Sequence, residues 1–329
     1  MSKKSKKKRQ PGIGAAIFVL IVFIFISILA LQQIRIIQKN DIGQEANSSS
    51  LLKTAIPNYK HIFVILEEND SFKHIYGNPK ASFLNSFMSQ NSLAANYHAV
   101  AHPSLPNYLA LIGGTTGGIS TDCLPDYINH TCVLNHNNLT DEIEKSGRTW
   151  KAYYESMPAA CSTVPIDNVY SVNMNPFVYF NDIYNTPGRC NQHDVPFSQL
   201  SSDIAGAKNG DLPNFVFIVP NMCNDMHSCP INVGDAWIAG ESTKLLDSQP
   251  FTKQNSLLAI TWDEDDHSQD NLVPLILAGS QVRKNYVSYN HYNHYSLLHT
   301  IEKAWNLQPL TSNDKNAPTL NEFFILTQQ

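Results

Sequence analysis

The chain has 329 residues and a formal net charge of −5, from 23 basic and 28 acidic residues. Eight of the basic residues precede the first acidic residue, Asp41, so the remainder carries 15 basic against 28 acidic residues, a formal charge of −13. Such an acidic surface excludes nucleic acid as a partner and is compatible with bound cations. The sequence implies no organic cofactor.

The N-terminus has the pattern of a membrane anchor. Residues 2–9 carry six positive charges, and residues 12–31 form a run of 20 residues without a charge, the length that a bilayer span needs. The basic flank predicts a single-pass protein with its N-terminus in the cytoplasm and the rest outside the cell membrane. A cleaved signal peptide is the alternative and would make the protein secreted, although Leu29-Ala30-Leu31-Gln32 is a poor cleavage site.

Three parts of the chain are expected from this pattern. They are a basic tail with a transmembrane helix in residues 1–39, a polar tether in residues 40–58 and one folded domain in residues 59–329.

All six cysteines lie in the part expected outside the cell, where thiols oxidise, so we expect disulfides. Proximity in the sequence favours the pairs Cys123–Cys132 and Cys223–Cys229, which leaves Cys161–Cys190. Six cysteines allow many other connectivities. A zinc site is the alternative, but no Cys-x-x-Cys spacing supports it.

The first half of the domain predicts two strands and two helices. His61 to Leu66 is a continuous apolar run, typical of a strand buried on both faces, and it ends in an acidic stretch. Residues 81–91 have helical spacing. Leu139 to Ser146 predicts a short helix closed by a glycine, and Thr149 to Tyr153 predicts a strand.

The second half begins with loops and then returns to regular structure. Residues 155–211 are rich in Asn, Pro, Tyr and Cys and predict loops held by a disulfide. Further on, the pattern predicts strands at 214–219, 257–262 and 273–278 and helices at 235–246 and 295–305. Strands that alternate with helices indicate an α/β layered fold with a mostly parallel sheet.

The segment His102-Pro103-Ser104-Leu105-Pro106-Asn107-Tyr108 leads directly into an apolar run. Pro106 suits the first turn of a helix, where its missing N–H costs nothing, so we expect Ser104 at or just before a helix N-terminus. Free N–H groups and the helix dipole favour an anion such as phosphate there, and a hydroxyl in that place acts as a nucleophile once its pKa is lowered. The alternative is that Ser104 is only an N-cap.

Polar groups follow three of the predicted strands, at the edge where α/β sheets bind ligands. Carboxylates gathered there repel unless a cation holds them. Their oxygen atoms suit Mg²⁺, Ca²⁺ or Mn²⁺, or Zn²⁺ if a histidine joins. A metal beside Ser104 would favour its alkoxide, and a histidine would protonate the leaving group. The alternative reads these runs as solvated turns and His227 as a loop residue. The groups are Glu67, Glu68 and Asn69; Asn221, Asp225 and His227; and Asp263 to His267.

These segments, in this order, resemble the exported acid phosphatase and phospholipase C phosphoesterases of the alkaline-phosphatase-like superfamily. The resemblance covers roughly residues 60–307 and implies an α/β/α three-layer sandwich around the mostly parallel sheet. The matching stretches are Phe63 to Phe72, His102 to Tyr108, Pro220 to His227, Gly234 to Trp237, Thr261 to Glu264 and His294 to Glu302.

The resemblance also implies roles for single residues. It implies a divalent metal held by Glu68, Asn69, Asp263 and Glu264, with Ser104 as nucleophile and further ligand. It implies histidines that assist at the phosphate, which we assign to His227 and His294, with His102 as part of the nucleophile motif. We expect four more residues to support the metal ligands or the phosphate: Asn107, Asn221, Asp225 and Asp235.

Two departures from the family pattern bear on the site. The family often has a glycine after the Asp-Glu pair, where this chain has Asp265-Asp266-His267, which would alter the metal site or add a ligand. His299 stands where relatives often carry Arg, which would weaken a basic contact.

The expected function is hydrolysis of phosphate monoesters outside the cell through a phosphoserine intermediate. The sequence lacks the C-terminal extension of the larger phospholipase C members, which favours the acid-phosphatase-like group. A phospholipase C-type phosphodiesterase is the alternative, and a non-catalytic surface binding protein that keeps the fold is a third interpretation.

Overall fold

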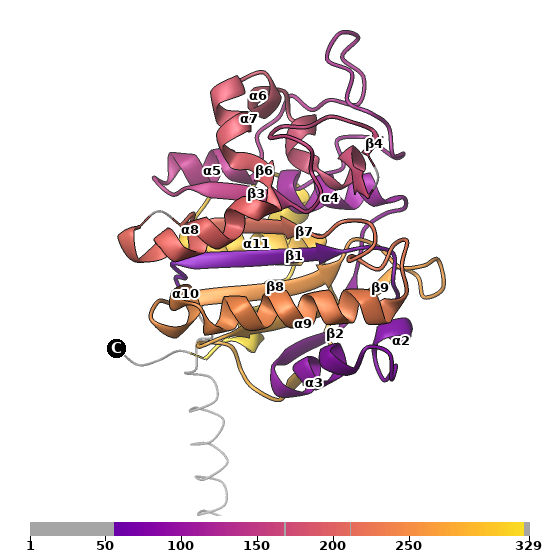
Figure 1. Ribbon diagram of the computed structural model, residues 1–329, viewed down its shortest axis with the longest axis vertical. Coiled ribbons are helices and arrows are strands. Elements are labelled where there is room, and N and C mark those ends of the chain that lie inside the picture. The colour runs from indigo at the N-terminus through magenta and orange to yellow at the C-terminus, as the bar shows by residue number, and fades with distance from the viewer. Residues whose placement is uncertain (1–55, 168, 211, 326–329) are drawn as a thin grey trace, which may run out of the picture. The chain divides into compact units, whose positions relative to one another are not determined.

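A computed structural model describes residues 56–167, 169–210 and 212–325 (Figure 1). Its centre is a 9-stranded sheet in the order β10-β2-β9-β8-β1-β7-β3-β6, with β11 beside β2. The strands are β1 (His61–Glu67), β2 (Ser92–His98), β3 (Trp150–Tyr154), β6 (Asp194–Pro196), β7 (Phe215–Val219), β8 (Ser256–Trp262), β9 (Leu272–Gly279), β10 (Tyr286–Ser288) and β11 (Tyr292–Asn293). Two short strands, β4 (Ile166–Asp167) and β5 (Tyr170–Ser171), form a separate pair.

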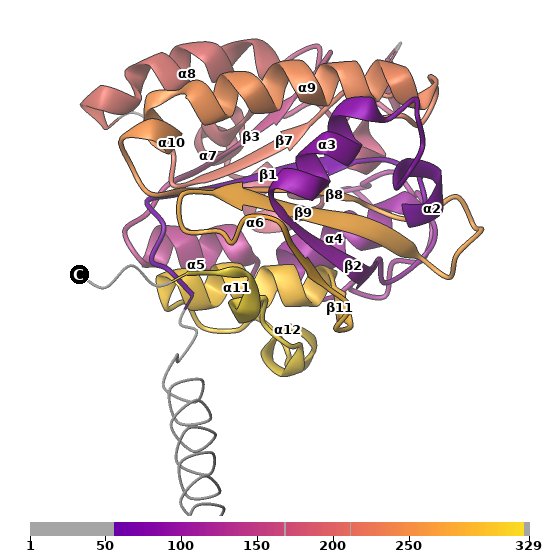
Figure 2. The ribbon, with the colours of Figure 1, turned by 90° about the horizontal axis from the view of Figure 1, so that it is seen from below.

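Helices cover both faces of this sheet, which confirms the three-layer α/β/α arrangement (Figure 2). One face carries α3 (Ser82–Gln90), α8 (Leu200–Gly206), α9 (Ile231–Asp247) and α10 (Gln249–Thr252). The other face carries α4 (Ser104–Gly113), α5 (Leu139–Lys145), α11 (His294–Trp305) and α12 (Ser312–Asn316). The remaining α-helices are α2 (Phe72–Ile75), α6 (Asn181–Tyr184) and α7 (Pro187–His193). Short 3-10 turns are η1 (Val172–Met174), η2 (Pro176–Tyr179), η3 (Phe197–Gln199), η4 (Ala207–Asn209) and η5 (Asn321–Phe323).

The sheet is mixed, which corrects one detail of the expected fold. The five strands β8-β1-β7-β3-β6 run parallel to one another, as expected. β9 is antiparallel to both of its neighbours, β8 and β2. The connection from β8 to β9 contains no helix, and a parallel return needs a crossover of a dozen or more residues. The strand at 273–278 was therefore predicted, but its direction was not.

Two other elements differ from the sequence-based expectation. β2 lies between β9 and β10, yet its sequence Ser-Leu-Ala-Ala-Asn-Tyr-His has no continuous apolar run, and no strand is predicted there. α9 begins at Ile231, four residues before the predicted start at Asp235. Pro230 is its N-cap, and the Pro230 carbonyl accepts the Val233 N–H in the first turn.

The middle of the sheet positions the functional site. All seven residues of β1 are buried, and β1 lies between β7 and β8 with Ile65 level with both Ile218 and Ile260. Since the three strands are parallel and in step, their carboxyl ends come out at the same edge of the sheet. The polar residues that follow them must therefore meet.

The three expected disulfides, Cys123–Cys132, Cys161–Cys190 and Cys223–Cys229, are all present. The alternative of a cysteine-rich zinc site is wrong, because these bonds use all six sulfur atoms.

The expected membrane segment, residues 12–31, and most of the expected tether lie outside the described residues. Within the described ranges, every helix is too short or too polar to cross a membrane.

Candidate active site

Ser104 is the first residue of α4, as the Pro106 pattern predicts. The preceding N-cap position is occupied by Pro103, and the Ser104 side chain makes no capping bond to the helix. Its hydroxyl instead points at two carboxylates, with Oγ 3.0 Å from Glu68 Oε2 and 3.3 Å from Glu264 Oε1. Both acceptors are buried. The alternative that Ser104 is merely a helix cap therefore does not describe its contacts.

The carboxylates reach Ser104 because three strand ends are tied together by main-chain bonds. The Glu68 N–H, just after β1, donates to the Asp225 carbonyl beyond β7 at 3.0 Å. The Asp263 N–H, just after β8, donates to the Glu67 carbonyl at 2.9 Å. The Tyr108 hydroxyl, one turn along α4, donates to Glu68 Oε1 at 2.7 Å.

Asn69 links the first and third strand ends. It adopts a left-handed backbone conformation (φ 44°), which asparagine tolerates better than most residues. Its N–H donates to Asp263 Oδ1 at 3.1 Å and its Nδ2 donates to Glu264 Oε1 at 2.7 Å. These bonds fix the Asn69 side chain, and its carbonyl oxygen Oδ1 has no hydrogen-bond partner.

The expected metal ligands pass a chemical test of fit. Asn69 Oδ1 and Asp263 Oδ2 are buried and lack a hydrogen-bond partner, although buried polar atoms are normally satisfied. Glu264 Oε2 is buried beside them and faces His102 Nδ1. Unpaired oxygen atoms beside a serine hydroxyl are the donors that a hard divalent cation takes. A different group, Cys161, Cys190 and Asp194, has its ligand atoms within 4.8 Å of one another, but its two sulfur atoms are bonded to each other.

The electrostatics of the cluster point the same way. Burial, followed by neighbouring carboxylates, raises the pKa of Glu68 and of Asp263 well above its ordinary value. Burial likewise raises the pKa of Glu264 to about 7. Carboxylates that are this costly to ionise either hold protons or share a cation.

His294 lies behind the carboxylates. It is the first residue of α11 and is fully buried, with Nε2 2.7 Å from the Asp263 carbonyl and Nδ1 2.9 Å from the Tyr97 hydroxyl. Burial lowers its pKa to about 4. Both ring nitrogens are thus engaged, and the ring holds the Asp263 backbone rather than facing the phosphate as the resemblance implies.

His227 is the histidine that shares a cleft with the serine. It lines the same cleft as Ser104, and its Nδ1 lies 3.0 Å from the Ser228 hydroxyl. Burial lowers its pKa, and the neighbouring Asp122 opposes this shift.

His102 sits between two acidic residues. Its Nδ1 lies 2.5 Å from Glu264 Oε2 and its Nε2 lies 3.2 Å from Asp265 Oδ1. The His267 ring stacks on it with centroids 4.0 Å apart. The residues that replace the family glycine therefore pack around His102. The other departure, His299, lies elsewhere and bonds the Ala317 carbonyl at 2.8 Å.

Three of the four expected supporting residues shape the loops of the site. Asn107 accepts the N–H groups of Val100 and Ala101 and so holds the turn before Ser104. Asn221 accepts the N–H groups of Cys223 and Asn224, and Asp225 accepts the N–H of His227 at 2.8 Å.

The fourth residue, Asp235, has a different task. Its two carboxylate oxygens accept the N–H groups of Phe83 and Leu84, at the start of α3. Such bonds satisfy the free donors of a helix N-terminus, so Asp235 joins α9 to α3 and is not one of the residues brought to Ser104.

The cleft contains residues that sequence reasoning missed. It has a volume of about 180 Å³. Asp122 Oδ1 accepts the Leu105 N–H at 3.0 Å, at the helix N-terminus beside the nucleophile. No local signal marks Asp122, although it directly precedes Cys123 of an expected disulfide. The missed lining residues are Asp122, Ser171, Asn173, Met174 and Met222.

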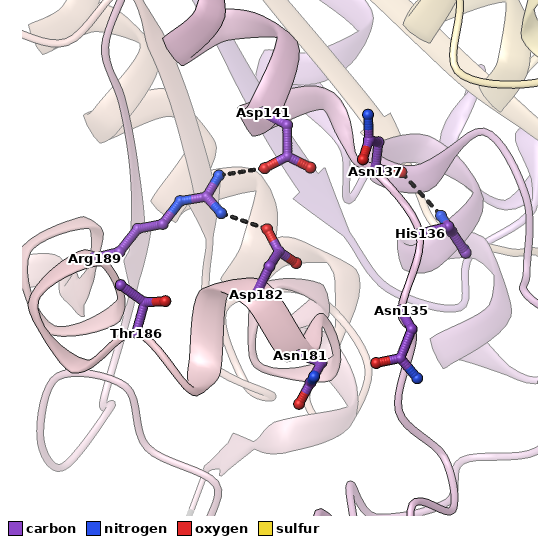
Figure 3. Close-up of a pocket in the computed structure, with 8 residues that line it drawn as sticks. All are labelled: Asn135, His136, Asn137, Asp141, Asn181, Asp182, Thr186 and Arg189. Atoms are coloured by element: carbon purple, nitrogen blue, oxygen red, sulfur yellow. Dashed lines mark hydrogen bonds and ion pairs between the residues drawn. The ribbon is translucent and has the colours of Figure 1, made fainter.

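A larger cavity of about 450 Å³ lies between α5, α6 and α7 (Figure 3). Its one basic residue, Arg189, pairs with Asp141 at 2.7 Å, Glu144 at 2.9 Å and Asp182. Figure 3 shows the guanidinium turned toward Asp141 and Asp182. Because three carboxylates already surround it, Arg189 offers no charge to a phosphate, and the chemistry is best placed at Ser104.

A serine at a helix N-terminus, facing buried carboxylates at the carboxyl edge of an α/β/α sheet, is an arrangement suited to a hydrolase. The Phosphoesterase family model matches residues 78–308, and the chain belongs to this family. It is therefore a hydrolase of phosphoric ester bonds.

Named relatives agree with this assignment. The chain is 35% identical to a phosphatidylinositol-3-phosphatase of Mycobacterium tuberculosis over 83% of this chain and 86% of that protein. It is 29% identical to a probable acid phosphatase of Kluyveromyces lactis, covering 80% of this chain and 62% of that one. A non-hemolytic phospholipase C of Burkholderia pseudomallei is 26% identical over 54% of this chain and 28% of its own length.

Solved structures share the fold at low sequence identity. A Vibrio parahaemolyticus protein of the alkaline phosphatase superfamily aligns with a TM-score of 0.54 at 12% identity, covering 80% of this chain and 71% of that one. Murine ectonucleotide pyrophosphatase/phosphodiesterase 5, in complex with AMP, aligns with a TM-score of 0.53 at 12% identity, covering 81% and 100%. The alkaline-phosphatase-like fold expected from the resemblance is thus confirmed.

Proposed function

We propose that this protein is a metal-dependent phosphomonoesterase that works outside the cell through a phosphoserine intermediate. The observation that carries the proposal is the Ser104 hydroxyl, bonded to Glu68 and Glu264 at the N-terminus of α4. The acid phosphatases among its relatives support the same class of reaction.

The reaction has two balanced steps. Ser104 Oγ attacks phosphorus as its proton passes to Glu68 or Glu264, the bond to the leaving oxygen breaks, and the alcohol departs with a proton from the facing wall, where His227 is our candidate donor. Water then attacks the phosphoserine and gives a proton to His227, the bond between phosphorus and the serine oxygen breaks, and that oxygen takes back the proton from Glu68 or Glu264 as phosphate leaves. The first N–H groups of α4 lie where they can stabilise negative charge on the phosphoryl oxygens.

The residues that would hold the metal are Glu68, Asn69, Asp263 and Glu264, together with Ser104. Members of this superfamily are generally metal-dependent, and the unpaired buried oxygens of the set suit Mg²⁺, Ca²⁺, Mn²⁺ or Zn²⁺. A bound divalent ion would favour the serine alkoxide and offset charge on the phosphoryl group.

The size of the cleft favours monoesters over diesters. About 180 Å³ accommodates a phosphate and a small part of its alcohol, with Met174 and Met222 offering an apolar wall. A phospholipase C-type phosphodiesterase is the second candidate, supported by the Burkholderia relative. A non-catalytic binding protein is the third, and the intact nucleophile arrangement argues against it.

The proposed location is the outer face of the cell membrane. The basic tail and the uncharged run of residues 12–31 support an anchor. Three disulfides support an oxidising environment for the domain. If the N-terminal segment is cleaved, the same domain is secreted.

The test is phosphate release from p-nitrophenyl phosphate by the full chain, with and without EDTA, beside Ser104→Ala. We expect the wild type to turn over only with metal and the variant to lose at least about a thousandfold in rate, as nucleophile removal does in other hydrolases. Ser171→Ala, a serine in the wall of the same cleft, is the matched control and should keep most of the rate. Turnover that survives in Ser104→Ala would overturn the nucleophile assignment, and a wild type active only on phosphodiesters would establish the second candidate.

A further inference from the structure

A hairpin projects beside the cleft, and nothing in the proposed reaction uses it. Residues 123–132, here called the rim hairpin, are closed by the Cys123–Cys132 disulfide and by paired main-chain bonds between Asp126 and Thr131. In Figure 1 this stretch lies in the purple-magenta loops at the upper edge of the domain.

The tip of the rim hairpin is apolar and exposed. Ile128 is 89% exposed and Leu124 is 47% exposed. The neighbouring Tyr127 does not share this exposure, because its ring stacks on Tyr184 of α6 with centroids 3.9 Å apart. With Tyr127 fixed against the domain, Ile128 is left facing solvent.

The tip is also rigid and nearly free of available charge. Asp126 is its one acidic residue, and its carboxylate accepts the N–H groups of Ile128 and Asn129 and the Asn129 side-chain amide. No Lys or Arg occurs between Lys80 and Lys145. An ordered apolar side chain held out in this way gains free energy from leaving water without first losing much conformational entropy.

The base of the hairpin is part of the active-site cleft. Asp122, the residue before Cys123, lines the cleft and accepts the Leu105 N–H beside Ser104. The Tyr179 hydroxyl donates to the Cys123 carbonyl at 2.9 Å, which fixes the base on the domain. The hairpin is therefore joined at its base to the wall of the cleft that contains the nucleophile.

We propose that the rim hairpin inserts Ile128 and Leu124 into a lipid surface, so that Ser104 works on phosphate esters in the headgroup layer of a membrane. The inference rests on the proposed phosphomonoesterase and narrows its substrate class to lipid phosphates. The substrate's phosphoryl group would enter the cleft while its acyl chains stay in the bilayer, which agrees with a cleft of about 180 Å³ that is too small for a whole lipid.

A bilayer fits the tip better than a protein partner does. Stable protein interfaces bury about 800 Å² on each partner, far more than two side chains at the end of a hairpin provide. A bilayer needs only a shallow apolar wedge, and the anchor expected at residues 12–31 would supply high local concentration. Because the tip carries no Lys or Arg, contact should not depend on anionic lipid or on salt, unlike that of a polybasic patch.

Insertion of the rim hairpin into a bilayer can be measured without an assay of enzyme activity. The full chain carrying Ile128→Trp would be reconstituted in phosphatidylcholine vesicles, with and without brominated acyl chains, and its added tryptophan emission compared with the unsubstituted chain. Tyr289→Trp is the matched control, because Tyr289 is 76% exposed and follows β10 at the opposite edge of the sheet. We expect quenching of the added emission at position 128 and none at position 289.

A kinetic arm uses long-chain phosphatidate in the same vesicles and soluble p-nitrophenyl phosphate. Ile128→Ser should lower the rate on vesicle phosphatidate about tenfold, which corresponds to the partition cost of one exposed large side chain. It should leave the rate on soluble p-nitrophenyl phosphate unchanged, and Tyr289→Ser should change neither rate.

Solvent-like emission at position 128, or equal loss of rate on both substrates, would overturn the inference. If the wild type fails on both substrates while quenching persists, the proposed function fails and the lipid contact stands. Quenching that disappears in salt or depends on anionic lipid would replace insertion by a charge contact and also overturn it.

Discussion

The strand-end cluster and the rim of the cleft meet at Ser104 but are built in different ways. The cluster consists of Glu68, Asn69, Asp263 and Glu264, which are positioned by parallel strands and by main-chain bonds between strand ends. The rim consists of loop residues that each lie in or beside a disulfide: Asp122 next to Cys123, Met174 between Cys161 and Cys190, and Met222 and His227 beside or within Cys223–Cys229.

The difference separates the nucleophile and metal chemistry from the choice of substrate and the proton donor. Like charges in a buried cluster cost free energy, so the sheet must hold them firmly and a cation must offset them. The rim carries little buried charge and gains its order from covalent links, which constrain loops that have no sheet to hold them. We expect changes in the cluster to abolish turnover, and changes in the rim to alter which substrate is accepted.

The largest expected effect comes from removing one cluster oxygen. Asp263→Asn should lose bound divalent metal and lower turnover of p-nitrophenyl phosphate at least about a hundredfold, because Oδ2 of Asp263 is buried without a partner. Metal content after dialysis, measured by atomic emission, separates loss of the ion from loss of activity. Asp266→Asn is the control in the same acidic run, since Asp266 contacts His74 rather than Ser104. Full metal retention in Asp263→Asn would remove Asp263 from the ligand set.

An intermediate effect is expected on stability as a function of pH. Burial raises the pKa of Glu68 and Asp263, and that of Glu264 to about 7. An acid whose pKa is raised in the folded state binds more protons there than in the unfolded state. Without metal, such a carboxyl therefore stabilises the fold at pH values below its unfolded-state pKa. This stabilisation is lost as the pH rises from the unfolded-state pKa toward the raised one, about 7 for Glu264. A bound cation reverses this loss.

EDTA should therefore lower the melting temperature by several degrees at pH 7.5 and by little at pH 4.5. Differential scanning fluorimetry at the two pH values, with Mg²⁺, Mn²⁺ or Zn²⁺ added back, measures the effect and identifies the preferred ion. No shift at either pH would show that the cluster does not depend on a cation, and an equal shift at both would show that ionisation of these carboxylates does not control the effect.

The sequence predicted the cluster better than the rim, for a physical reason. The apolar runs of β1 and β8 specify buried strands, and buried parallel strands oblige the residues after them, such as Glu68 and Asp263, to meet at one edge. Ser104 was placed by an equally local signal, the proline at the start of α4. Each of these predictions uses only the amino acids that directly precede and follow the residue in the sequence.

The rim depends on contacts between distant loops, which a single sequence does not encode locally. Asp122 reaches Leu105 across a loop, and Asn173 and Met174 enter the cleft from a stretch whose pattern predicted only loops. His294 and Asp235 were recognised by their motifs, yet one holds the Asp263 backbone and the other holds α3. A sequence motif indicates that a polar residue has a role, but the group to which that residue hydrogen-bonds in the folded protein determines the role.

The smallest expected effect comes from the rim itself. Replacing Cys223 and Cys229 together by serine opens a loop with a sequence separation of 6, which corresponds to about 2 kcal/mol of lost constraint on the unfolded chain. The melting temperature should fall by a few degrees. For p-nitrophenyl phosphate, KM should rise several-fold because Met222 loses its fixed position, and kcat should fall because His227, the candidate proton donor, loses its own. Metal content should stay unchanged, since the cluster is held by the sheet. If the double variant also loses its metal, the rim and the cluster form one cooperative unit, and the separation drawn between them is wrong.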